Sequence, residues 1–233
     1  MAEQAPYSYI ADYYESVQVK NAAFPDIAEF WLNGFRHVTG ESVLNLGCGP
    51  MFYDNAVRFG EPPSRYVGLD LNASTFDFLE QSDHPTLVKN REICRALGIE
   101  TEFIAGDVFD HVDTLSGRFD TVLGIGFFGT FSGDTFDALL RASRQMLKPE
   151  GRLLKMTWHG AQRSDAQREA KLKYRYDNDE EPSADDLICL IEAQGFSTVE
   201  NDVLICPPDT VGWDAIQVAL FTPDDGALKG VGS

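Results

Sequence analysis

Four short segments hold residue types that can bind a ligand, and each follows a run of apolar residues. They are Gly47-Cys48-Gly49, Asp70, Asp107 and Gly124-Ile125-Gly126. Glycine has no side chain, so the backbone can approach a ligand closely at these turns. Asp70 stands 21 residues after Gly49, a spacing that suits a carboxylate accepting hydrogen bonds from two ribose hydroxyls. In this order, the four segments indicate a nucleoside-binding site.

The first glycine turn argues against a dinucleotide. The dinucleotide fingerprint needs a third glycine, where a helix packs on the strand and receives a pyrophosphate. Phe52 occupies that place, and Pro50 removes one backbone donor from the turn. A ligand with a nucleoside but no phosphate fits better, and S-adenosylmethionine (SAM) is such a ligand.

The chain around these segments alternates between short apolar runs and longer amphipathic stretches. We expect strands at 42–46, 66–70, 102–105, 119–125, 152–158, 199–206 and 215–221. We expect helices over 8–38 (broken near Pro25), 53–59, 85–97, 135–147 and 184–194. This alternation favours a mainly parallel sheet covered on both faces. The last two strands are joined by residues 207–214, which is too short for a parallel crossover and predicts an antiparallel pair.

From about residue 40 to residue 222 the sequence resembles the class I SAM-dependent methyltransferases. Five segments in the family's order carry this resemblance: Val43–Gly49, Tyr66–Asp70, Phe103–Val108, Phe119–Gly124 and Met146–Leu153. The resemblance implies an α/β fold with a seven-stranded Rossmann-like doubly wound sheet, mainly parallel with one antiparallel strand near the C-terminus. It implies an N-terminal helical lid (1–39), a SAM-binding domain (40–222) and a C-terminal tail (223–233). Within the domain, 159–183 is expected to be an inserted lid, an interface segment or a surface excursion.

The resemblance also implies which residues meet the methionine part of SAM. Gly47 and Gly49 would let the chain pass close to it, and Gly124 would offer its carbonyl to the ammonium group. Asn45 stands where the family usually has an acid, so it would keep a polar contact without the charge. Met51-Phe52 replaces a third small residue, which predicts an altered entry of the first helix.

The same resemblance assigns the nucleoside contacts. Asp70 would bind the ribose, and Leu71 would pack on the adenine ring. Asp107 and the backbone amide of Val108 would hold the adenine edge. Tyr14 would close over the cofactor from the N-terminal helix, with Tyr9 and Tyr13 as alternatives and simple packing as the competing interpretation.

A general base is needed only when the acceptor must lose a proton as it attacks. His159 follows the fifth predicted strand, so it could face the cleft, and imidazole suits this role near neutral pH. The competing interpretation is a loop histidine without a catalytic role. Cys48, Cys94, Cys189 and Cys206 are far apart and show no zinc spacing, so no metal is expected.

The amino-acid composition limits the classes of partner that the protein can bind. The 233 residues carry 19 Lys and Arg against 37 Asp and Glu, for a net charge of -18, which disfavours a nucleic-acid substrate. No apolar run reaches the length of a membrane span, and the N-terminus lacks the basic start and apolar stretch of a secretory signal. We therefore expect a cytoplasmic enzyme with a small-molecule substrate, and a homodimer is possible.

Methyl transfer from SAM to a small-molecule acceptor is the function that these patterns favour, with specialised metabolism as a candidate setting. One alternative transfers or cyclises the aminocarboxypropyl group of SAM. A second is a non-catalytic partner subunit on the same fold. A nicotinamide oxidoreductase is the third.

Overall fold

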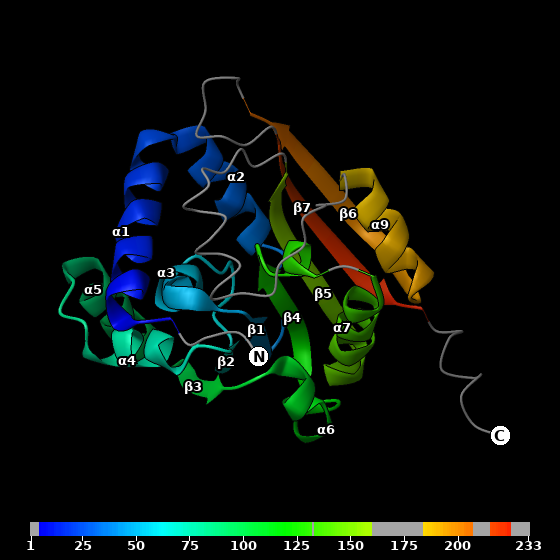
Figure 1. Cartoon of the computed structure of the whole chain (residues 1–233), viewed down its shortest axis with the longest axis horizontal. Coiled ribbons are helices and arrows are strands. Elements are labelled where there is room, and N and C mark those ends of the chain that lie inside the picture. Colours follow the sequence, from blue (N-terminus) through cyan, green and yellow to red (C-terminus); the bar gives the residue numbers. More distant parts are fainter. Residues whose placement is uncertain (1–4, 132, 160–183, 207–214, 225–233) are drawn as a thin grey trace.

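The computed structural model describes residues 5–131, 133–159, 184–206 and 215–224, and shows helices on both sides of one central sheet (Figure 1). The strands are β1 (Ser42–Leu46), β2 (Arg65–Asp70), β3 (Glu100–Ala105), β4 (Phe119–Ile125), β5 (Leu147–His159), β6 (Phe196–Ile205) and β7 (Ala215–Pro223). The helices are α1 (Tyr7–Ala23), α2 (Pro25–Phe35), α3 (Phe52–Ala56), α4 (Ala73–Gln81), α5 (Pro85–Ala96), α6 (Val112–Leu115), α7 (Gly133–Met146) and α9 (Ala184–Ala193). Short 3-10 turns are η1 (Gly49–Met51), η2 (Val108–His111) and η3 (Phe128–Thr130).

The seven strands form one sheet in the order β3-β2-β1-β4-β5-β7-β6. β1 pairs in parallel with β2 on one side and with β4 on the other, so the strand order reverses at β1. β7 runs antiparallel to both of its neighbours, β5 and β6. This confirms the predicted doubly wound sheet with one reversed strand. Because ligands of such sheets bind where the strand order reverses, the topology predicts a binding site at the carboxyl end of β1.

The central strands β1, β2 and β4 are buried on both faces, which explains why they read as nearly continuous apolar runs. Neighbouring residues of β4 and β5 point to opposite sides, so Leu123 and Leu154 join one apolar cluster while Val122 and Leu153 join another. Helices α1 to α5 cover the first face, and α6, α7 and α9 cover the second (Figure 1). The N-terminal helices thus share a core with the sheet, through residues such as Trp31.

A carboxylate at the start of β4 ties the opposite, amino end of the sheet together. Asp120 Oδ2 accepts hydrogen bonds from the Ser42 amide at 2.9 Å and from the Ser42 hydroxyl at 2.8 Å. Lys148 Nζ lies 2.8 Å from both Asp120 oxygens. Burial alone would raise the pKa of Asp120, but these hydrogen bonds outweigh it and lower the pKa. The network fixes β1 against β4 and β5, and so aligns the three central strand ends at the other edge.

The structure differs from the sequence prediction at several element ends. α4 was not predicted, although its buried Phe76, Phe78 and Leu79 pack on the first face of the sheet. β5 begins at Leu147, earlier than the predicted start at residue 152, and its pairing with β4 is irregular between Phe119 and Thr121. Among the described helices, none is long and apolar enough to cross a membrane.

Candidate functional site

A cleft opens at the carboxyl edge of the sheet, beside the point where the strand order reverses. The strands supply Gly47–Gly49, Asp70–Asn72, Gly106–Val108, Ile125–Phe127 and Trp158 to its wall. α1 and α2 supply Tyr9, Ile10, Tyr13, Val17, Trp31 and Phe35. With its open mouth included, the cleft has a volume of about 1370 Å³. Its lining combines apolar and aromatic side chains with a few polar groups, as ligand-binding clefts do.

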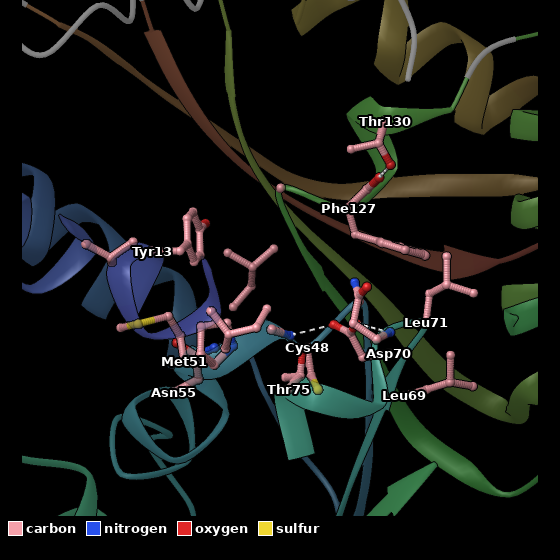
Figure 2. Close-up of a pocket in the computed structure, with 18 of the residues that line it drawn as sticks. Tyr13, Cys48, Met51, Asn55, Leu69, Asp70, Leu71, Thr75, Phe127 and Thr130 are labelled. Carbon is pink, nitrogen blue, oxygen red and sulfur yellow. Dashed lines mark hydrogen bonds between the residues drawn. The ribbon is translucent and has the colours of Figure 1, made fainter. Parts of the chain in front are cut away.

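A hydrogen bond joins the glycine turn to the acid at the end of β2 (Figure 2). The backbone amide of Gly49 donates to Asp70 Oδ2 at 3.0 Å. The backbone amide of Asn72 donates to Asp70 Oδ1 at 2.9 Å. The Cys48 amide also donates to the carbonyl of Leu69 at 3.2 Å, which holds the turn against β2. Both oxygens of Asp70 are thus oriented by backbone amides at the cleft wall.

The two glycines of the turn are needed for different reasons. Gly47 has φ +57°, and a Cβ built on it would lie 2.2 Å from the ring of Phe127. Gly49 has φ +54°, but a Cβ there would have nothing within 4 Å. Positive φ disfavours any residue with a side chain at both places. Gly47 therefore also makes room for an aromatic wall, whereas Gly49 serves backbone conformation alone.

A second acid lies beside Asp70 at the end of β3. The amide of Gly106 donates to the Asp70 carbonyl at 3.0 Å, so the turn after β3 is held against the end of β2. Asp107 Oδ1 accepts from the Phe109 amide at 3.1 Å and caps η2. Leu71 and Val108 line the cleft next to the two carboxylates. Two acids with apolar neighbours match the hydroxyl groups and the flat ring of a nucleoside.

Helix α1 covers the cleft with residues spaced by four, namely Tyr9, Tyr13 and Val17. Tyr14 lies on another side of this helix and is fully buried. Its hydroxyl donates to Asp54 at 3.1 Å, and Gln18 Nε2 donates to the same carboxylate at 2.7 Å. Burial raises the pKa of both Tyr14 and Asp54. Tyr14, which was predicted to close over the cofactor, does not line the cleft, because the helical turn directs it onto α3 instead.

The start of α1 is also tied to the loop that follows β2. The amide of Ala5 donates to Asn72 Oδ1 at 2.8 Å, and Ser74 Oγ donates to the Ala5 carbonyl. Since Asn72 also contacts Asp70, the entry to α1 and the candidate ribose-binding acid share one hydrogen-bonded loop. The covering helix is therefore anchored at the cleft wall.

No family model and no curated protein matches the sequence. Solved structures do match over nearly the whole chain. DhpI in complex with SAH has a TM-score of 0.60 at 19% identity, with 94% of this chain and 95% of that chain covered. The Burkholderia thailandensis 1,6-didemethyltoxoflavin-N1-methyltransferase, with its substrate and S-adenosylhomocysteine bound, has a TM-score of 0.54 at 19% identity over 97% and 93%. The chain has the class I methyltransferase fold.

This methyltransferase fold is not tied to methyl transfer alone. The [4+2]-cyclase SpnF also matches, with a TM-score of 0.53 at 14% identity over 81% of this chain and 76% of that chain. At these identities the likeness establishes how the chain folds, while the reaction has to be argued from the cleft itself.

Six of the residues predicted to bind the cofactor line the cleft of the methyltransferase fold: Gly47, Gly49, Asp70, Leu71, Asp107 and Val108. All six lie at the end of a strand or within three residues after it. The predicted strand ends were therefore enough to indicate that these residues line the cleft. Four other predicted residues do not line it: Tyr14, Asn45, Gly124 and His159.

Asn45 lies within the sheet and contacts Tyr66 instead of the cleft. Asn45 Nδ2 donates to the Tyr66 hydroxyl at 2.7 Å. The ring of Phe52 stacks on Tyr66 with centroids 4.0 Å apart. A Cβ on Gly68 would lie 2.9 Å from this Phe52 ring. The two departures from the family pattern, Asn45 and Phe52, therefore meet at one tyrosine, where they form a packed unit under the glycine turn.

Gly124 is also a packing position. A Cβ on Gly124 would lie 2.4 Å from the ring of Phe128, which is fully buried. The cleft is reached at the next two positions, by Ile125 and Gly126. The sequence pattern indicated this strand end. The residues that line the cleft begin one position after Gly124.

His159 does not line the cleft, because successive side chains of a strand point to opposite faces. Trp158 faces the cleft, so His159 points to the other face of β5. There His159 Nε2 lies 3.1 Å from Gln217 Oε1, and the buried Lys155 donates to the same oxygen. Burial holds the pKa of Lys155 well below its usual range. This position does not support a general-base role for His159.

Several cleft residues were not predicted, in particular Asn55, Arg58, Trp31 and Trp158. Trp158 is the last residue of the predicted strand 152–158 and lies next to His159 in the sequence. Its position at a strand end was therefore a signal for a cleft residue. Asn55 and Arg58 belong to the segment after the glycine turn, and only the register of this short helix decides which of its side chains face the ligand.

A cluster with metal-ligand chemistry lies away from the cleft. His37 Nδ1 is 3.2 Å from Glu200 Oε2. Asp202 brings a second carboxylate, so that three ligand-type atoms lie within 4.8 Å of one another. None of the three residues lines the cleft. Sequence spacing could not reveal this group, because His37 is far from β6 along the chain.

Proposed function

We propose that the chain binds SAM and transfers its methyl group to a small-molecule acceptor. The observation that carries this proposal is the hydrogen bond from the Gly49 amide to Asp70. In a dinucleotide site, amides of this turn face a pyrophosphate. Here the Gly49 amide is directed at a carboxylate, and that carboxylate repels a phosphate. A nucleoside without phosphate is the ligand that this turn favours.

The remaining cleft residues fit SAM. Asp70 lines the cleft at the end of β2, where its carboxylate would accept hydrogen bonds from the ribose hydroxyls. Asp107 and the Val108 amide would hold the adenine edge, with Leu71 against its face. Gly47 and Gly49 would allow the methionine part to lie close to the backbone.

SAM, when bound, supplies a methyl group on a sulfonium that is already activated for in-line displacement. The protein then has to align the acceptor and exclude water. Aromatic side chains from three elements can do this: Tyr13 from α1, Trp31 from α2 and Trp158 from β5. Cys48 also lines the cleft, but burial and the nearby Asp70 raise the pKa of its thiol. It therefore stays protonated and does not serve as a nucleophile.

Calorimetry with SAM, S-adenosylhomocysteine and NAD tests the cofactor. We expect both SAM and S-adenosylhomocysteine to bind and NAD to give no heat. Binding of NAD but not SAM would overturn the proposal, and binding of none of the three would support a non-catalytic subunit.

Product analysis then tests the reaction. Incubation of the protein and SAM with a panel of small-molecule acceptors, followed by mass spectrometry, should yield S-adenosylhomocysteine. Methylthioadenosine in its place would contradict methyl transfer and support use of the aminocarboxypropyl group.

A further inference from the structure

The segment after the glycine turn presents three side chains to the cleft. Met51, Asn55 and Arg58 are spaced by four and three residues, so they share one side of α3 and its ends. Met51 lies next to the glycine turn. Arg58 is seven residues further along, in the turn that follows α3. The lining of the cleft thus continues from the glycine turn along α3 to the turn beyond it.

Two polar side chains in this extension have hydrogen-bonding capacity that the protein does not use. Asn55 is 5% exposed, and no hydrogen bond links its side-chain amide to another described residue. Arg58 is half-buried. Its backbone amide donates to the Asn55 carbonyl at 2.9 Å, but its side chain makes no hydrogen bond or ion pair with the described part of the chain. Buried polar groups in native proteins usually have partners. An unpartnered amide and an unpartnered guanidinium facing one cleft therefore indicate a ligand that supplies the acceptors.

The guanidinium of Arg58 is available to bind an anionic ligand. Among the described residues that line the cleft, it is the single basic side chain. Figure 2 shows Met51 and Asn55 close together and apart from Asp70. Asp54 already accepts hydrogen bonds from α1 and does not line the cleft. Burial raises the pKa of Asp54, and the charge of Arg58 opposes this only in part. Asp54 thus acts on Arg58 through its charge, but it forms no ion pair with this guanidinium.

Aromatic side chains also line the cleft. Trp31 and Phe35 come from α2, and Tyr13 comes from α1. Trp31 meets Trp158 edge to face, with ring centroids 5.4 Å apart. Aromatic walls of this kind favour flat apolar molecules through stacking and edge-to-face contacts.

We propose that this extension binds the acceptor, and that the acceptor is an aromatic acid whose carboxylate is held by Arg58 and Asn55. Guanidinium pairs with a carboxylate through two parallel hydrogen bonds, and the Asn55 amide can donate a third. The inference rests on the proposed function for the identity of the second ligand. The methionine carboxylate of SAM is a poorer match, because the cofactor's methionine belongs at the glycine turn and Arg58 lies beyond the far end of α3.

Binding of a matched pair of probes, 2-naphthoate and 2-naphthamide, tests the inference by calorimetry with and without S-adenosylhomocysteine. The two molecules share a shape and differ in charge. The wild-type protein should bind the acid at least about 10-fold more tightly than the amide, because a charged hydrogen bond is made only by the acid. Equal affinities for the two probes would overturn the inference.

Variants of Arg58 separate charge from packing. Arg58→Gln should remove the preference for the acid, and Arg58→Lys should keep part of it. Arg118→Gln removes the same charge from an exposed position outside the cleft and should keep the full preference. Thermal denaturation checks that each variant is folded. Retained acid preference in Arg58→Gln would contradict the assignment.

The affinity for SAM distinguishes this inference from the proposed function. If SAM binds to the wild-type protein but the probes show no charge preference, only the inference fails. If Arg58→Gln loses SAM affinity by about 10-fold or more, the guanidinium serves the cofactor and the inference is overturned. If SAM does not bind at all, the proposed function fails, whereas an acid preference that depends on Arg58 still supports an anion site at α3.

Discussion

The Gly49 amide and the Asp70 carboxylate lie 3.0 Å apart and form a hydrogen bond across two strand ends. This bond joins the turn after β1 to the end of β2. The second oxygen of Asp70 is held by the Asn72 amide at 2.9 Å. The carboxylate is therefore fixed before any ligand arrives, and a ribose would meet an oriented acceptor without further ordering of the side chain.

Replacement of Asp70 should weaken SAM binding. Asp70→Ala removes both the charge and the anchor of the Gly49 amide, so we expect a loss of about 10-fold or more in affinity. Asp70→Asn keeps one oxygen acceptor and should give a smaller loss. Isothermal calorimetry with SAM measures both. Asp77→Ala removes an acid from an exposed position on α4 and serves as the control. Unchanged SAM affinity in a folded Asp70→Ala protein would contradict the ribose role.

The pairing of Gly49 with Asp70 could be anticipated from the sequence, because both residues lie at the ends of predicted strands of a parallel sheet. Strand prediction needs only apolar runs and turn residues, and both are clear at 42–46 and 66–70. The antiparallel orientation of β7 could equally be predicted from the sequence, because the connection between β6 and β7 is too short for a parallel crossover.

Residues away from the strand ends could not be placed in this way. Tyr9, Tyr13 and Tyr14 all lie on α1, and the sequence does not reveal which side of that helix faces the cleft. The helix has polar and apolar residues around its whole circumference, so its pattern selects no face. The buried acceptor Asp54 decides the orientation by binding Tyr14, and this acid lies 40 residues further along the chain.

The burial of Asp54 beneath Tyr14 predicts a pH-dependent stability. Burial raises the pKa of Asp54 above its ordinary value of 3.8. Its contribution to stability is therefore fully present below pH 3.8, and it is lost as the pH rises through the higher folded pKa. Asp54→Asn removes this titration while it keeps an oxygen to accept from Tyr14 and Gln18.

Urea denaturation across the acid-to-neutral range measures the effect. The free energy of unfolding of Asp54→Asn should improve relative to the wild-type protein as the pH rises. Tyr14→Phe, which removes one hydrogen bond, should lower the free energy of unfolding by about 1 kcal/mol. A difference between Asp54→Asn and wild type that stays constant with pH would show that the carboxyl is not perturbed by burial.

The two glycines of the turn offer a matched pair of substitutions. Both have positive φ, so an alanine at either costs about 1 kcal/mol or more in backbone strain. Gly47→Ala also drives a Cβ to within 2.2 Å of the Phe127 ring, whereas Gly49→Ala meets nothing within 4 Å. Thermal denaturation should therefore show a clearly larger loss of stability for Gly47→Ala.

SAM affinity should follow the same order, because displacement of Phe127 deforms the cleft wall. A second change tests that cause. Phe127→Ala opens the space that a side chain at residue 47 would occupy, so the double variant Gly47→Ala with Phe127→Ala should lose less than the sum of the two single losses. Strict additivity of the losses in stability would mean that backbone strain alone, and not the clash with Phe127, requires glycine at residue 47.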